Sequence, residues 1–135
     1  MAAVTDRAVR LVRSGEDVLT ARQLVREWAI AAGFSLVDQT KLLTAASELA
    51  RNTVIYGGGG TMTVEALTNG VRRGVRVVFE DDGPGIADVE QALRDGFSSG
   101  GGLGLGLGGA RRLANEFEID SRPGEGTRVQ ITRWK

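Results

Sequence analysis

The stretch Val75-Arg-Val-Val-Phe-Glu-Asp-Asp-Gly-Pro-Gly-Ile86 joins a β-branched, apolar run to an acidic, glycine-rich turn. The run as far as Glu80 predicts a strand. Asp81 stands at the end of this strand, and Gly83 and Gly85 follow at alternate positions. A buried carboxylate there can accept a hydrogen bond from the exocyclic amine of adenine, while the glycines let the chain pass against the base. An ordinary acidic turn is an equal alternative, because Asp-Gly and Gly-Pro are turn formers.

The other elements follow from the periodicity on either side of this stretch. Apolar residues at 3.6 spacing predict two helices, each opened by a serine N-cap, at Ser14 and at Ser35. Asn69-Gly70 predicts a hairpin turn between two strands. The expected strands are Ala8–Val12, Thr61–Leu67, Val75–Glu80, Glu118–Ser121 and Thr127–Trp134, and the expected helices are Val18–Ala32, Ser35–Tyr56, Asp88–Asp95 and Gly109–Phe117.

This order of elements predicts one α+β domain spanning residues 1–135. Hairpin-like connections favour a mixed, mostly antiparallel sheet, with the helices layered on one face as a two-layer sandwich. The alternation of strand and helix that a doubly wound parallel sheet requires is not present.

Composition excludes several classes of protein. The chain has no Cys and no His, which removes disulfides, thiolate or imidazole zinc sites, Cys nucleophiles, Ser-His-Asp triads and phosphorylated histidines. The formal net charge of zero argues against a nucleic-acid-binding domain. The sequence holds neither a long apolar run nor a signal-peptide pattern, so we expect a cytoplasmic protein with no membrane partner.

A tract rich in glycine, Ser98 to Gly109, leads directly into a predicted helix. Glycines ahead of a helix N-terminus can direct several free N–H groups at one anion, and the helix dipole favours that anion. Residues Gly104 to Gly109 match the dinucleotide pattern G-x-G-x-x-G, but no strand precedes them. The Walker pattern fails as well, because no Lys-Ser or Lys-Thr follows. We therefore favour an anion-binding loop for this tract, with a flexible linker as the alternative.

Glu48-Leu-Ala-Arg-Asn52 lies inside the second predicted helix. Glu48 and Asn52 are four positions apart, so their side chains project from the same face about one turn apart. A carboxylate and an amide oxygen placed in this way can share a hydrated magnesium ion and a hydroxyl group. Two polar residues on a solvated helix face are the simpler alternative.

In order and spacing, these segments resemble the GHKL ATPase superfamily. The set is E-x-x-x-N on a helix, D-x-G-x-G after a strand, a glycine tract before a helix, and a late Gly124-Glu-Gly126-Thr127. Within the superfamily the chain is similar to the RsbT-type serine/threonine kinases that regulate bacterial sigma factors. This similarity covers nearly the whole chain and implies the GHKL, or Bergerat, ATPase fold.

The resemblance implies a role for each matched position. Glu48 would activate the attacking hydroxyl, and Asn52 would hold Mg²⁺ against the phosphates of ATP. An ATP lid would span residues 87–101, and Arg51 and Arg94 are both candidates for contacting the γ-phosphate. The remaining implied ATP-binding positions are Asp81, Gly83, Gly85 and Ile86 around adenine, Gly102, Leu103, Gly104, Leu105, Gly106 and Leu107 along the phosphates, and Thr127 on the adenine side.

The resemblance also implies partners. The kinase would phosphorylate Ser or Thr of a STAS-domain protein and, once released, activate a PPM-type phosphatase. One alternative is an anti-sigma factor kinase that binds a sigma factor directly. Another is a catalytically silent module that binds nucleotide or only protein, although intact Glu48, Asn52 and Asp81 argue against it.

Overall fold

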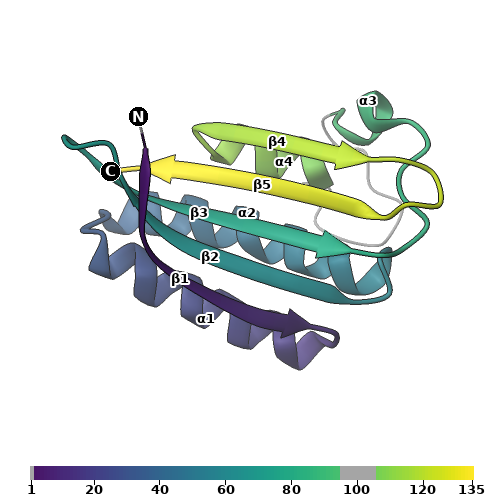
Figure 1. Ribbon diagram of the computed structural model, residues 1–135, viewed down its shortest axis with the longest axis horizontal. Coiled ribbons are helices and arrows are strands. Elements are labelled where there is room, and N and C mark those ends of the chain that lie inside the picture. The colour runs from purple at the N-terminus through teal and green to yellow at the C-terminus, as the bar shows by residue number, and fades with distance from the viewer. Residues whose placement is uncertain (1, 95–105) are drawn as a thin grey trace.

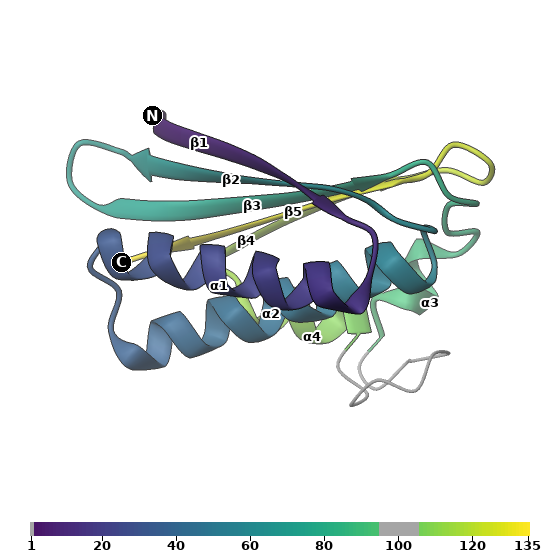
Figure 2. The ribbon, with the colours of Figure 1, turned by 90° about the horizontal axis from the view of Figure 1, so that it is seen from below.

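A five-stranded sheet and a layer of helices make up the fold, which the computed structural model describes for residues 2–94 and 106–135. The helices cover one face of the sheet, and the other face is open (Figure 1, Figure 2). The expected α+β two-layer architecture is confirmed. In chain order the elements are β1 (Ala3–Val12), α1 (Gly15–Ala31), α2 (Leu36–Ile55), β2 (Gly60–Thr68), β3 (Arg73–Asp81), α3 (Val89–Ala92), α4 (Gly106–Leu113), β4 (Glu116–Ser121) and β5 (Thr127–Trp134).

The strands lie in the order β1-β2-β3-β5-β4, and each of the four pairings is antiparallel. The sequence predicted a mixed, mostly antiparallel sheet, and all strand pairings among the described residues are antiparallel. Because β5 lies between β3 and β4, the last strand of the chain borders the strand that carries the D-x-G-x-G turn. Asp81 at the end of β3 is directly opposite Thr127 at the start of β5.

Helices α1 and α2 hold the apolar layer against the sheet. Both predicted N-caps are confirmed, since Ser14 Oγ accepts from the Asp17 N–H at 3.2 Å and Ser35 Oγ from the Asp38 N–H at 3.1 Å. The buried faces are rich in alanine, which lets the helices lie close to the strands. Fully or nearly fully buried residues include Ala21, Val25 and Ala29 of α1, Leu42, Ala45, Ala46 and Leu49 of α2, and Met62, Val64, Val77, Phe79 and Ile131 of the sheet.

The predicted bounds of β1, α3 and α4 were wrong. Strand β1 begins at Ala3 rather than Ala8, because its first half buries little and is held by pairing with β2, a pairing that apolar periodicity does not indicate. Helix α3 covers only Val89–Ala92. Helix α4 runs over Gly106–Leu113 rather than Gly109–Phe117. Its end is set where the Asn115 N–H donates to the Thr132 carbonyl at 2.9 Å and draws the chain into the sheet.

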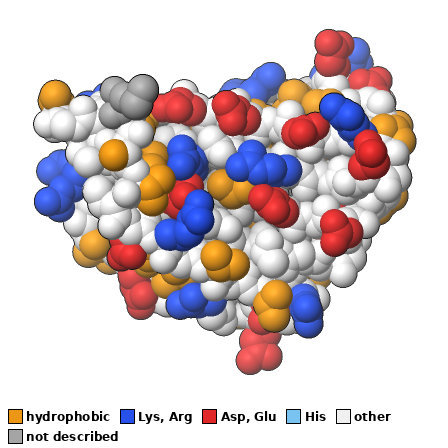
Figure 3. Space-filling view, viewed as in Figure 1, with side chains coloured by type: hydrophobic (Ala, Val, Ile, Leu, Met, Phe, Trp, Pro, Cys, Tyr) orange, Lys and Arg blue, Asp and Glu red, His pale blue; other side chains and the backbone are white. Residues whose placement is uncertain are grey.

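The open face of the sheet carries positive and negative side chains interspersed (Figure 3). On this face Glu65 of β2 is only 2% exposed, although none of the described helices covers it. Its two carboxylate oxygens accept from Arg7 Nη2 at 2.9 Å and from Arg76 Nε at 2.7 Å. The two arginines therefore both neutralise and cover the carboxylate. Among the residues described, no helix has the length and apolar character needed to cross a membrane.

Candidate functional site

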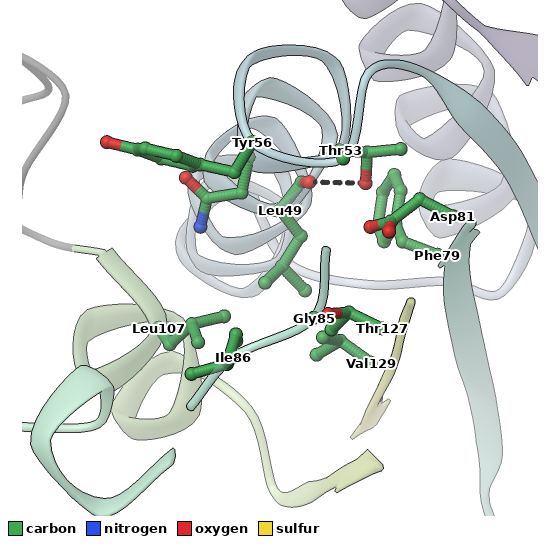
Figure 4. A pocket seen from close by; sticks show the side chains of 12 residues that line it. Leu49, Thr53, Tyr56, Phe79, Asp81, Gly85, Ile86, Leu107, Thr127 and Val129 are labelled. Atoms are coloured by element: carbon green, nitrogen blue, oxygen red, sulfur yellow. Dashed lines mark hydrogen bonds between the residues drawn. The ribbon is translucent and has the colours of Figure 1, made fainter. Parts of the chain in front are cut away.

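A pocket opens where the end of α2, the end of β3, the start of β5 and the start of α4 meet (Figure 4). Six of the residues implied as ATP-binding line it: Asn52, Asp81, Gly85, Ile86, Leu107 and Thr127. They come from four separate segments of the chain, so the fold brings together positions that the motifs only placed in order. Their binding roles stay predictions.

Asp81 lies on the wall of this pocket with its two oxygens in different surroundings. Oδ1 accepts the N–H of Gly83 at 2.9 Å. The carboxylate also packs against Gly57, where an added Cβ would lie 2.4 Å from Asp81 Cγ and 2.5 Å from Oδ2. Within the described part of the chain, Oδ2 accepts no hydrogen bond. One oxygen of a half-buried carboxylate is thus available to a donor on a ligand.

Thr127 reaches the pocket from the first position of β5, beside Asp81. Its hydroxyl lies 2.8 Å from the hydroxyl of Ser121, the last residue of β4. Ser121 Oγ also accepts the Ile86 N–H at 2.8 Å, which joins the D-x-G-x-G turn to the β4–β5 hairpin. Ser121 was not among the predicted site residues, because its link to the D-x-G-x-G turn joins it to Ile86, 35 residues away in sequence.

Glu48 does not line the pocket; it lies one helical turn before Asn52, which does. Its side chain is largely buried, 9% exposed, and Oε1 is 3.7 Å from Nη1 of Arg51. Arg51 is more accessible, with 40% of its side chain exposed. A carboxylate and a guanidinium therefore stand together beside the pocket, on the helix that supplies the polar residue inside it.

The apolar wall of the pocket was not predicted. It is formed by Leu49, Thr53, Tyr56, Phe79 and Val129, with Gly57 between the helix and Asp81. Thr53 does not offer its proton to a ligand, because its Oγ1 donates to the Leu49 carbonyl at 2.9 Å (Figure 4). The polar groups thus converge near Asp81 and Thr127, while the rest of the wall suits a flat, apolar ring.

Part of the predicted phosphate loop lies outside the described residues, namely Gly102, Leu103, Gly104 and Leu105. Residues 95–101 of the predicted lid also lie outside them. Gly106 begins α4 with a φ of 51°, and Leu107 is 7% exposed and lines the pocket. The start of α4 therefore borders the pocket, where a helix N-terminus favours an anion.

Asn52, the predicted Mg²⁺ ligand, is among the residues that line the pocket. No group of three acidic side chains that could hold a metal occurs in the ranges described. Mg²⁺ in nucleotide sites is instead held largely by phosphate oxygens and water, with few protein ligands. Asn52, at the edge of the pocket, is suited to supply one such ligand.

Comparison with known proteins identifies the family. Residues 37–135 match the family described as histidine kinase-, DNA gyrase B- and HSP90-like ATPases. The chain is 46% identical, over 118 residues, to the serine/threonine-protein kinase RsbT of Bacillus subtilis, covering 87% of this chain and 89% of that protein. The chain belongs to this ATPase family. Within it, the chain is an RsbT-type serine/threonine kinase, as the motifs indicated.

More distant relatives extend the same relationship. The anti-sigma F factor of Thermoanaerobacter sp. is 29% identical over 120 residues, covering 84% of this chain and 82% of that protein. Among solved structures, the RsbU and RsbW domains of a Mycobacterium tuberculosis protein match with a TM-score of 0.68 at 22% identity, covering 97% of this chain and 33% of that longer chain. The mycobacterial sensor histidine kinase MprB matches with a TM-score of 0.54 at 19% identity, covering 94% and 97%. These two structures support the fold, and the sequence relatives support the family.

Proposed function

We propose that this kinase transfers the γ-phosphate of ATP to Ser or Thr of a STAS-domain protein in a sigma-factor regulatory switch, and that the released kinase activates a PPM-type phosphatase. The observation that carries the proposal is the convergence of Asn52, Asp81 and Thr127 in one pocket, with Glu48 one helical turn away. The similarity to RsbT supports the regulatory context. A switch of this kind acts in the cytoplasm.

Adenine is the part of ATP that the pocket suits best. Asp81 Oδ2 would accept from its exocyclic amine, and Phe79 and Val129 offer an apolar wall for the ring. The phosphates would then extend toward the start of α4, where Gly106 and Leu107 begin the helix. Bound Mg²⁺, held in part by Asn52, would neutralise phosphate charge.

Glu48 would act on the protein substrate. Its carboxylate would accept the proton of the Ser or Thr hydroxyl as that oxygen forms its bond to the γ-phosphorus and ADP leaves. Because only 9% of the Glu48 side chain is exposed, few water molecules reach its carboxylate. Arg51, whose Nη1 is 3.7 Å from Glu48 Oε1, would orient that carboxylate or contact the γ-phosphate.

A direct test is phosphoryl transfer from radiolabelled ATP with magnesium to purified STAS-domain proteins of the same organism. We expect label on one STAS protein, and none on a variant in which its acceptor Ser or Thr is replaced by Ala. The Glu48→Gln kinase serves as the matched control for contaminating activities. No transfer to any STAS protein, with ATP binding intact, would contradict the proposal.

The anti-sigma F relatives favour a second candidate, in which the kinase binds a sigma factor directly. Co-purification with sigma factors, with and without ATP, distinguishes the two. A complex with a sigma factor and no transfer to STAS proteins would favour the second. A protein that binds ATP but neither transfers phosphate nor binds a sigma factor would be a silent nucleotide-gated module.

A further inference from the structure

The hydroxyl of Ser121 lies within hydrogen-bond distance of three groups. The Ile86 N–H is 2.8 Å away, the Gly126 carbonyl 3.2 Å and the Thr127 hydroxyl 2.8 Å. Ser121 is half-buried and directly opposite Thr127 in the β4–β5 pairing. A single side chain thus links the D-x-G-x-G turn, the hairpin backbone and a residue of the pocket wall.

Counting protons assigns a direction to each bond. A serine hydroxyl has one proton and two lone pairs. The Ile86 N–H can only donate, so it takes one lone pair, and the Gly126 carbonyl can only accept, so it takes the proton. Thr127 must then donate its own proton to the second lone pair of Ser121 if all three bonds form together. Thr127 Oγ1 is left with lone pairs and no proton to offer a ligand.

The position of Thr127 makes this direction matter. Thr127 and Asp81 are cross-strand partners and both line the pocket. Such partners have Cβ atoms only about 5 Å apart. Two hydrogen-bond acceptors therefore stand side by side, and an exocyclic amino group carries two protons.

We propose that Ser121 is a positioning residue that holds Thr127 as a second acceptor beside Asp81, so that the pocket selects a base with an exocyclic amino group over one with a carbonyl there. This inference rests on the proposed binding of ATP in this pocket and adds a source of base specificity. In the absence of the Ser121 hydroxyl, the Thr127 proton is free to turn toward the pocket and pair with a carbonyl.

The surrounding backbone allows this role to be separated from folding. The Gly124 N–H donates to the Pro84 carbonyl at 2.7 Å. An added Cβ at Gly85 would lie 2.0 Å from the Arg122 carbonyl oxygen, and one at Gly126 2.1 Å from the Asp81 carbonyl oxygen. Turn and hairpin are therefore packed backbone to backbone without help from Ser121, and we expect Ser121→Ala to keep them in place.

The experiment uses calorimetry to compare the affinities of ATP and inosine triphosphate, in which a carbonyl replaces the exocyclic amino group and N1 carries a proton. We expect Ser121→Ala to weaken ATP binding by about threefold to tenfold, the range for one hydrogen bond, and to leave inosine triphosphate unchanged or tighter. The preference for ATP over inosine triphosphate, given as the ratio of the two affinities, should therefore fall. Ser121→Thr keeps a hydroxyl and should restore the wild-type ratio.

A double-variant cycle separates positioning from a general structural effect. Thr127→Val removes the hydroxyl that Ser121 is proposed to orient, so Ser121→Ala should change the affinity ratio no further in that background. Equal effects of Ser121→Ala in both backgrounds, or an unchanged ratio in the single variant, would overturn this inference alone. Failure of the wild-type protein to bind ATP would overturn the proposed function and this inference with it.

Discussion

Gly57 packs against the carboxylate of Asp81 so closely that a Cβ at Gly57 would lie 2.4 Å from Asp81 Cγ. Gly57 follows α2 and Asp81 ends β3, so the contact joins the two layers of the fold at the pocket. Real Cβ atoms do not approach other atoms this closely. A side chain at Gly57 therefore has to displace the carboxylate that we propose to bind adenine.

Gly57→Ala should lower the magnitude of the free energy of ATP binding by more than it lowers the free energy of unfolding. Displacing Asp81 removes one charge-assisted hydrogen bond to the base, which corresponds to about 1.5–3 kcal/mol of ATP affinity. Calorimetry with ATP measures the loss, and thermal unfolding confirms that the variant is folded. Gly15→Ala is the matched control, because a Cβ there meets nothing within 4 Å. Wild-type affinity in Gly57→Ala would show that Asp81 moves without cost or does not touch the base.

Asp81→Asn tests the same contact from the other side. The substitution turns an acceptor oxygen into a donor facing the donor of adenine, and we expect a loss of about 2–4 kcal/mol in ATP affinity. GTP presents an acceptor at that position and should bind poorly to the wild-type protein. Titrations with both nucleotides check this. An ATP affinity within twofold of wild type would remove Asp81 from the adenine site.

The main elements of the fold were predictable because their burial is periodic. Helices α1 and α2 each bury one stripe, which is visible as apolar residues at helical spacing, and their serine caps fix where they begin. Strand β1 was predicted at half its length because only Val12 is buried within it. Backbone hydrogen bonds to β2 hold the rest of that strand, and such bonds do not require any particular pattern of apolar side chains.

The candidate site was predictable only where a residue type at a fixed spacing carries the chemistry. Asp81, Asn52 and Thr127 belong to short motifs, and the pocket contains all three. Gly57 and Ser121 act through contacts that exist only once distant segments meet, Gly57 with Asp81 and Ser121 with Ile86. No local pattern signals such contacts, so they could be found only in the folded chain.

Acid should destabilise this protein partly through Glu65. Burial would raise the pKa of Glu65, but the hydrogen bonds from Arg76 and Arg7 outweigh it and hold the pKa below the ordinary value of 4.5. A lowered folded-state pKa adds stability that is present above the ordinary value and is lost as the pH falls through the folded value. We expect the free energy of unfolding to decline in that window.

Glu65→Gln should flatten this decline and lower stability at neutral pH by about 1–3 kcal/mol, because the arginines lose a buried charged partner. Chemical denaturation between pH 3 and pH 7 measures both effects. Glu80→Gln is the control, since its ion pair with Arg128 is exposed by 55% and 45% and should contribute less than about 1 kcal/mol. An equally steep acid decline in Glu65→Gln would assign the effect to other carboxylates, Asp38 among them, whose pKa the hydrogen bond from Arg133 lowers.

Glu48→Gln separates catalysis from binding. Glutamine keeps the size of the side chain but cannot take a proton from the attacking hydroxyl, so phosphoryl transfer should fall by roughly 10²–10⁴-fold. Because Glu48 does not line the pocket, ATP affinity should change by less than about 1 kcal/mol. Single-turnover phosphoryl transfer to the STAS protein that the wild-type kinase modifies measures the rate. Calorimetry with ATP measures the affinity independently.

Asn52→Ala should behave differently from Glu48→Gln, although the two residues are one helical turn apart. Asn52 lines the pocket, and a metal ligand acts in both the ground state and the transition state. Its removal should therefore weaken magnesium-dependent ATP binding as well as the rate, and excess Mg²⁺ should recover part of the loss. If instead Glu48→Gln transfers phosphate at near wild-type speed while Asn52→Ala loses both properties, the pocket binds nucleotide but Glu48 is not the base, and the hydroxyl must be activated by another group.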